Sequence, residues 1–303
     1  MISALSGFAL IGAIVLAGWC VGRWRVLPGG AEPVLGRLVY AVLTPCLLFT
    51  VVADADLHVL LSEPLLASAA AAFTCFGLFA LIFRRLDRGT TVLGALSGGY
   101  VNANYIGIPV ATYVLGDAAL VVPIVMLQLL LVTPVALTLL EITTTGRSSV
   151  RTTLTTPLRN PLIVAVLLGL LGNTTGVELP AVLAEPVATI GSAAVPVVLI
   201  AFGMSLVGRR VLEPGTDRVA TVAAVALKTV VMPLLAYGTA ILFGLPRSET
   251  YAVVVLAALP TAQHIFLYAQ RFRTAELLVR DTIFLSTLAA IPVLLLIAVL
   301  FTR

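Results

Sequence analysis

The sequence is poor in charge and lacks the motifs on which soluble enzymes depend. Only 11% of its 303 residues are charged, whereas 60% are hydrophobic, and the mean hydropathy is +1.12. Because a soluble domain carries about 25% charged residues, this composition excludes an ordinary soluble protein. The sequence contains no GxSxG, HExxH or Walker motif and no aspartate-rich diphosphate motif. We therefore predict that the protein is not an enzyme, has no cofactor or metal site, and binds no nucleic acid.

Cysteine is also rare. The three cysteines, Cys20, Cys46 and Cys75, fall within apolar stretches and share no metal-ligand spacing. We interpret them as small apolar fillers rather than ligands. The charged residues lie almost entirely in short loops, which leaves no soluble domain that could hydrolyse ATP.

Long hydrophobic runs take up the rest of the chain. A helix of about 20 apolar residues crosses about 30 Å of hydrocarbon. Ten such runs lie at residues 3–22, 34–53, 64–83, 91–115, 118–140, 161–177, 184–206, 219–243, 250–270 and 276–301. We predict an all-α polytopic membrane protein with ten transmembrane helices.

The arginines alternate between the loops that join these runs. Of the 18 basic residues, 15 lie at odd-numbered loops, Arg84 and Arg88 among them. Acidic residues such as Asp54 and Asp117 lie in the other loops. The positive-inside rule therefore places the odd loops in the cytoplasm and both termini on the extracytoplasmic side.

Two prolines in each half of the chain are spaced alike. Pro45 and Pro109 are 64 residues apart, as are Pro196 and Pro260, and the pairs are offset by 151 residues. Five runs per half is an odd number, so the second half enters the membrane in the opposite orientation. We predict a 5+5 inverted repeat; the alternative is chance spacing of common membrane prolines. The two repeats are residues 1–151 and 152–303.

Polar residues and glycines interrupt the fourth and ninth runs beside Pro109 and Pro260. An unwound membrane helix frees backbone groups that persist only where protein or a watery cavity surrounds them, and paired breaks mark transporter binding sites. We predict that polar residues at these breaks line a substrate site, with Gln128 either bridging helices or facing the same cavity. The alternative is a pair of polar kinks between packed helices. The candidate site residues are Asn102, Asn104, Tyr105, Gln128, Thr261, Gln263 and His264.

Lys228 and His264 lie well inside the predicted spans. Lys228, the only lysine, lies ten residues beyond Arg218 and so about 15 Å into the bilayer. A charge at that depth is costly and is by default a functional-site hypothesis. Lys228 either holds an anionic substrate or neutralises the carbonyl ends of the broken helices. His264 either relays protons or acts as a neutral hydrogen-bonding residue.

Several short motifs, in their order and spacing, make the sequence similar to the auxin efflux carrier family over nearly all of its membrane region. The motifs are Asn102 through Pro109, Gln128, Arg159-Asn160-Pro161, Phe202-Gly203-Met204-Ser205-Leu206, Lys228 with Pro233, and Leu259-Pro260-Thr261 running into Phe266-Leu267-Tyr268-Ala269-Gln270. The family includes the plant PIN-type carriers and bacterial permeases for malate or malonate.

The resemblance implies a fold like that of bile-acid symporters and sodium–proton antiporters, with broken helices four and nine crossing at Pro109 and Pro260. Spans 1, 2, 6 and 7 would form a scaffold, through which two copies of the chain would pair as a homodimer. Spans 3–5 and 8–10 would move as an elevator, and Asn102 and Gln128 would contact the substrate. The long cytoplasmic loop of the plant carriers is missing, so its phosphoregulation is not implied.

Together these features predict a secondary transporter that moves a small organic anion by alternating access. The abundance of arginine over lysine suggests GC-rich bacterial coding and hence a plasma membrane location. The main alternative is an exchanger or symporter coupled to protons or sodium through Lys228 or His264. A membrane sensor is disfavoured by the short loops, and an intramembrane enzyme by the lack of a carboxylate pair, metal cluster or nucleophile–base motif.

Overall fold

The computed structural model describes residues 2–28, 30–54, 63–145, 161–177, 179–207 and 218–301. This part of the chain is helical, and within it the one pairing of extended residues is an antiparallel bridge between Val101 and Thr261. The predicted all-helical fold is confirmed. The arginine-bearing loops at 146–160 and 208–217, which include the predicted repeat boundary, lie outside the described residues.

Five helical segments are long and apolar enough to cross a membrane. They are Ala31–Ala53, Glu63–Ile82, Ala181–Ser205, Arg218–Leu242 and Glu276–Phe301. Shorter apolar helices accompany them at Gly12–Arg23, Ala103–Leu115, Ala118–Leu127, Thr133–Thr143 and Pro161–Thr175. Every run predicted from the sequence contains helical residues, and several runs are divided into two or more helices.

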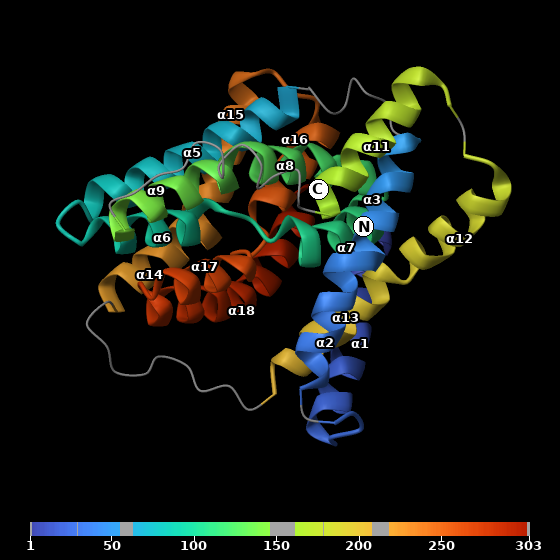
Figure 1. Cartoon of the computed structure of the whole chain (residues 1–303). Coiled ribbons are helices and arrows are strands. Elements are labelled where there is room, and N and C mark those ends of the chain that lie inside the picture. Colours follow the sequence, from blue (N-terminus) through green and yellow to red (C-terminus); the bar gives the residue numbers. More distant parts are fainter. Residues whose placement is uncertain are drawn as a thin grey trace.

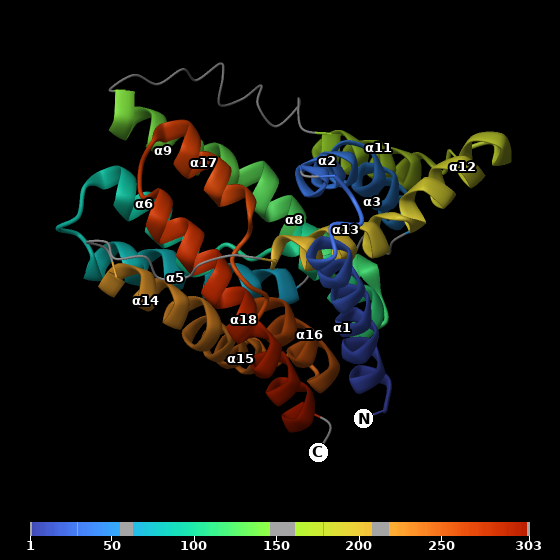
Figure 2. The ribbon, with the colours of Figure 1, turned by 90° about the horizontal axis from the view of Figure 1, so that it is seen from below.

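Helices from both halves of the chain form the first of two groups, which we name the first bundle (Figures 1 and 2). It comprises α1 (Ile2–Arg23), α2 (Ala31–Leu38), η1 (Val39–Leu43), α3 (Thr44–Ala53), α11 (Pro161–Thr175), α12 (Ala181–Ser192) and α13 (Ala194–Ser205). In this bundle α1 packs along α13, and α3 packs along α11 and α12. Each of these pairs joins the N-terminal half of the chain to the C-terminal half.

Glycines let the helices of the first bundle approach closely. A side chain at Gly18 in α1 would collide with the backbone of Ile200 in α13, and one at Gly203 in α13 would collide with Val15 in α1. Gly169 of α11 meets the backbone of α3 in the same way. Because lipid gives apolar helices no hydrophobic reason to associate, close packing of small residues is what holds such helices together.

The remaining helices form the second bundle, most of which lies on the other side of Figures 1 and 2. Its N-terminal half contributes α5 (Glu63–Ile82), α6 (Arg88–Gly99), η2 (Ala103–Gly107), α7 (Ile108–Val110), η3 (Ala111–Leu115), η4 (Ala118–Val121), α8 (Val122–Leu127), η5 (Gln128–Val132) and α9 (Thr133–Thr145). Its C-terminal half contributes α14 (Arg218–Ala226), η7 (Leu227–Val231), α15 (Met232–Leu242), α16 (Arg247–Ala257), α17 (His264–Phe272) and α18 (Glu276–Phe301). The two bundles meet where α1 contacts η3 and α13 contacts η2.

Candidate functional site

Two helices of the second bundle end inside the protein rather than at its surface. The α6 helix ends at Gly99, and Tyr100 after it has extended backbone angles. The α16 helix ends at Ala257, and helix resumes only at His264. We name residues 100–102 the first break and residues 258–263 the second break. Both breaks are enclosed, since Tyr100 and Ala258 are fully buried.

The two breaks pair with each other through their backbones. The Asn102 N–H donates to the Pro260 carbonyl at 2.8 Å, and the Ala262 N–H donates to the Tyr100 carbonyl at 3.2 Å. These bonds flank the bridge between Val101 and Thr261. Backbone groups that leave a helix inside a membrane protein need such partners, because no lipid group can supply them. The breaks therefore cross and satisfy one another.

Thr261 connects the crossing to two further helices. Its hydroxyl donates to the Ser97 carbonyl of α6 at 2.6 Å, and its N–H donates to the Ser286 hydroxyl of α18 at 3.1 Å. Thr261 and Ser286 are both fully buried. The second break is thus fixed to α6 and α18 as well as to the first break.

Lys228 is also fully buried, on η7 in the second bundle. Its ammonium donates to the Ala257 carbonyl at 2.6 Å and contacts the Met232 sulfur at 3.3 Å. Ala257 is the last residue of α16, so the ammonium lies at the negative end of that helix dipole. Of the two roles that the sequence left open, this contact fits the neutralisation of a broken helix.

Asn102 and Asn104 carry polar atoms that the protein leaves unused. The Asn102 side-chain oxygen accepts from the Tyr105 N–H at 3.2 Å, which caps the start of η2. The Asn102 amide nitrogen and the Asn104 amide oxygen are buried without a hydrogen-bond partner among the described residues. Asn102 is 1% exposed and Asn104 is 8% exposed. An unpaired buried amide is costly, so these atoms suit a ligand or water that the crossing admits.

Tyr100 of the first break belongs to a cluster of aromatic rings. The His264 ring contacts the Tyr100 ring edge-on with centroids 4.8 Å apart, and the Tyr268 ring at 5.6 Å. The Tyr100 hydroxyl and the Thr133 hydroxyl share a hydrogen bond of 2.9 Å. The His264 Nε2 atom is buried without a partner in the part of the chain that the structure describes. Gln263 lies next to His264 and is half-buried.

Gln128 lies at a small cavity rather than in a helix-bridging hydrogen bond. The cavity holds about 20 Å³ and is lined by Gln128, Gly99, Val101 and Ala257, among others. Gln128 is 6% exposed, and its amide has no hydrogen bond within the described ranges. The volume suffices for about one water molecule. Gln128 thus faces the ends of both interrupted helices, α6 and α16.

The remaining predicted residues are less directly involved. Tyr105 is half-buried and packs against the apolar core. Pro109, which we expected at the crossing with Pro260, lies instead in α7, within the first two positions of that helix. Because helical residues run from Ala103 to Leu115 without a gap, Pro109 lies inside this helix, directly after the π-helical turn η2. On the first break, Val101 and Asn102 take the place that we expected for Pro109.

Sequence reasoning missed several residues of this region. Tyr100 is part of the first break and bonds Thr133 of α9, and Ser97 and Ser286 each bond Thr261 of the second break. Asp281, an acidic residue within the last predicted span, is 6% exposed, and its carboxylate accepts from the Arg280 Nε at 2.9 Å. The signal for Ser286 and Asp281 was available, because both interrupt a long apolar helix.

The described residues contain no group of three or more histidine, cysteine or acidic side chains that could hold a metal ion. The thiol of Cys75 is buried and lies 3.9 Å from the Leu227 carbonyl. The polar functional groups at the crossing are therefore amides, hydroxyls, one imidazole and one ammonium.

The sequence matches the family model described as "Membrane transport protein" over residues 8–298. This range takes in both bundles, both breaks and Lys228. No curated protein matches the sequence.

Proposed function

The chain belongs to the family of membrane transport proteins that contains the auxin efflux carriers, and we propose that it moves a small organic anion across the membrane by elevator-type alternating access. In this proposal the helices form ten spans in a 5+5 inverted repeat. The antiparallel pairing of the two breaks supports opposite orientations of the two halves.

One observation carries the proposal: the unpaired, buried amide nitrogen of Asn102 at the crossing. A carboxylate is acceptor-only, so it would satisfy this donor. The helical residues 103–115 and α17 both begin at the crossing, and their N-terminal ends favour a negative charge. The Gln128 amide and the Gln263 side chain would complete the polar lining, with Thr261 and Lys228 holding the second break in place.

The division into two bundles supports an elevator. Both breaks lie in the second bundle, which would carry the substrate as a unit. The glycine-packed first bundle would act as the scaffold. We further propose that two copies pair through the first bundle in the plasma membrane, because α12 turns large apolar side chains outward, with Val182 83% exposed and Leu183 55% exposed.

Uptake into liposomes tests the proposal. Purified protein would be reconstituted into liposomes, and the uptake of labelled small carboxylates, amino acids and neutral analogues would be measured. The same uptake would be measured for the Asn102→Ser variant. Serine keeps an oxygen that can cap η2 but removes the unpaired amide nitrogen. We expect carboxylate uptake in the wild-type protein and its loss in the variant. Uptake of neutral solutes alone, or full carboxylate uptake by Asn102→Ser, would refute the proposal.

Ligand-induced thermal stabilisation of the purified protein gives a second measure. A carboxylate that binds the folded state at 100 times its Kd stabilises it by about 2.7 kcal/mol. We expect the rise in Tm for the transported carboxylate to vanish in Asn102→Ser while the Tm without ligand falls only slightly. A rise of equal size in both proteins would place the binding site elsewhere.

The buried, unpaired imidazole nitrogen of His264 supports a second candidate, coupling of transport to protons. Uptake would be measured with and without an imposed proton gradient, and separately with a sodium gradient. Coupling through His264 predicts that a proton gradient accelerates uptake and that His264→Gln removes the acceleration while downhill transport persists. Uptake that neither gradient accelerates would show that the carrier is uncoupled and would refute this second candidate.

A further inference from the structure

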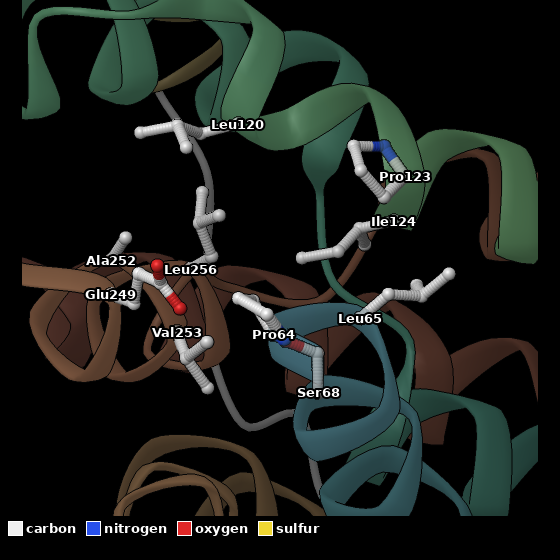
Figure 3. A pocket seen from close by; sticks show the side chains of 10 residues that line it. All are labelled: Pro64, Leu65, Ser68, Leu120, Pro123, Ile124, Glu249, Ala252, Val253 and Leu256. Atoms are coloured by element: carbon white, nitrogen blue, oxygen red, sulfur yellow. The ribbon is translucent and has the colours of Figure 1, made fainter. Parts of the chain in front are cut away.

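A second cavity lies between α5, α8 and α16 in the second bundle (Figure 3). It has a volume of about 280 Å³, near the lower end of the about 300–1,000 Å³ typical of ligand pockets. Pro64, Leu120 and Glu249 line its rim, close to the first residues of α5, η4 and α16. We name this cavity the vestibule. Glu249 is exposed, so the vestibule reaches the surface of the protein there.

The vestibule leads toward the crossing. Its inner wall includes Ser68, Ile124 and Leu256, and the same three residues line the 20 Å³ cavity beside Gln128. The two cavities are therefore neighbours separated only by shared side chains. Only these side chains and the small cavity separate a solute in the vestibule from the ends of α6 and α16.

Glu249 is the charged residue of the vestibule lining, and the rest of that lining is almost entirely apolar. Figure 3 shows its carboxylate oxygens directed across the cavity toward Pro64. Arg247, the nearest basic residue along the chain, instead donates to the Phe301 carbonyl at 3.0 Å. Within the described ranges no basic side chain pairs with Glu249.

We propose that Glu249 sets the charge selectivity of access to the crossing, favouring monoanions over dianions and cations over anions. The Glu249 side chain is exposed, so solvent partly screens its carboxylate, but the apolar walls beside it still leave a negative potential at the mouth of the cavity. A dianion meets twice the repulsion that a monoanion meets. The selectivity for monoanions rests on the proposed function, whereas the selectivity for cations is a property of the vestibule alone.

Charged thiol reagents test the vestibule without any substrate. Ser68→Cys, in a chain whose native cysteines are replaced by alanine, places a reporter thiol at the inner wall. Its reaction rates with cationic and anionic methanethiosulfonates of similar size would be measured in lipid nanodiscs. We expect the cationic reagent to react faster and Glu249→Gln to lower the cation-to-anion rate ratio about fivefold, the effect of about 1 kcal/mol of electrostatic energy. Ala252→Cys is the second reporter if Ser68→Cys folds poorly.

Glu63→Gln is the matched control, since Glu63 directly precedes Pro64 of the rim but is outside the vestibule lining. We expect it to leave the rate ratio nearly unchanged. An unreactive reporter, an unchanged ratio in Glu249→Gln, or an equal change in Glu63→Gln would each overturn the proposal.

Uptake separates this inference from the proposed function. In liposomes Glu249→Gln should raise uptake of a dicarboxylate relative to a monocarboxylate by about twofold, because these solutes differ by one charge and the thiol reagents by two. If the wild-type protein takes up no carboxylate, the proposed function fails, yet the thiol rates still decide the cation preference of the vestibule. If carboxylates are taken up but Glu249→Gln does not change the ratio of dicarboxylate to monocarboxylate uptake, the proposed selectivity for monoanions is wrong and the proposed function still stands.

Discussion

The two breaks are held in place by different means. The second break is fixed by side chains from other elements: Lys228 binds Ala257 at its start, and Thr261 binds Ser97 and Ser286. Every one of these contacts joins elements that are distant in the sequence. Lys228, the only buried ammonium of the described chain, is thus used to hold the second break.

The first break depends mainly on its own residues. Asn102 caps Tyr105 three positions later, and Tyr100 reaches Thr133 through a single hydroxyl pair. Here the Asn102 amide nitrogen and the Asn104 amide oxygen are left without partners in the described structure. The difference suggests a division of labour, in which the second break supports the crossing and the first break presents unsatisfied groups for binding. The predictions below test this division.

The largest expected effect is on the second break, in Lys228→Met. Methionine keeps much of the side-chain volume but leaves the buried Ala257 carbonyl without a donor. We expect a loss of about 2–3 kcal/mol in the free energy of unfolding, because a charge-assisted bond is lost and a helix C-terminus loses its cation. Thermal unfolding in detergent would measure it. Met232→Leu removes only the sulfur contact and is the control; equal losses in both variants would show that Lys228 does not stabilise α16.

A smaller loss is expected from Thr261→Val. The two side chains have similar shape, but valine cannot donate to the Ser97 carbonyl, which is then unpaired in a buried site. Interhelical hydrogen bonds in membrane proteins contribute about 0.6 kcal/mol on average and up to about 1.7, so a loss of about 1–2 kcal/mol is expected for this short bond. Thr261→Ser keeps the hydroxyl and should retain most of the stability. If the serine variant is the less stable one, the methyl group rather than the bond holds the second break.

How far the sequence predicted each break follows from the kind of signal involved. The all-helical fold could be predicted because apolar runs of membrane length are a local property. The second break was signalled by Pro260 among polar residues, and the structure interrupts the helix there. On the first break Pro109 does not mark the interruption, because proline is tolerated inside membrane helices and Pro109 lies within the helical residues 103–115. The better signals were Gly98 and Gly99, where α6 ends, and Asn102, a preferred N-cap residue.

The contacts that hold the crossing could not be predicted in the same way. Tyr100 and Thr133 are 33 positions apart, and Thr261 and Ser286 are 25 apart. A hydroxyl on an apolar helix has many partners available until the packing is known. The sequence predicted that Lys228 lies deep in the protein, but its bond to a carbonyl 29 positions away required the fold.

Asn102 should separate stability from binding on the first break. Asn102→Ala removes the cap of η2 and should cost about 1 kcal/mol in the free energy of unfolding, whereas Asn102→Ser keeps a capping oxygen and should cost less than about half of that. Thermal unfolding of the two variants, with binding measured on the same samples, checks this. Both variants should lose the carboxylate response. A serine variant that is as unstable as the alanine variant would mean that the amide nitrogen has a structural role.

The smallest effect is expected from Ser97→Ala, and a comparison with Ser286→Ala makes it informative. Both serines are fully buried next to Thr261. The Ser97 hydroxyl donates only to the Leu93 carbonyl of its own helix at 2.8 Å, so its loss should cost less than about 0.5 kcal/mol. The Ser286 hydroxyl accepts from the Thr261 N–H, and alanine leaves that donor buried and unpaired, at a cost of about 1 kcal/mol. Unfolding of the two variants side by side would reveal the difference. Equal losses would show that the second break does not depend on α18, and the division of labour between the breaks would then rest on Lys228 and the Thr261 hydroxyl alone.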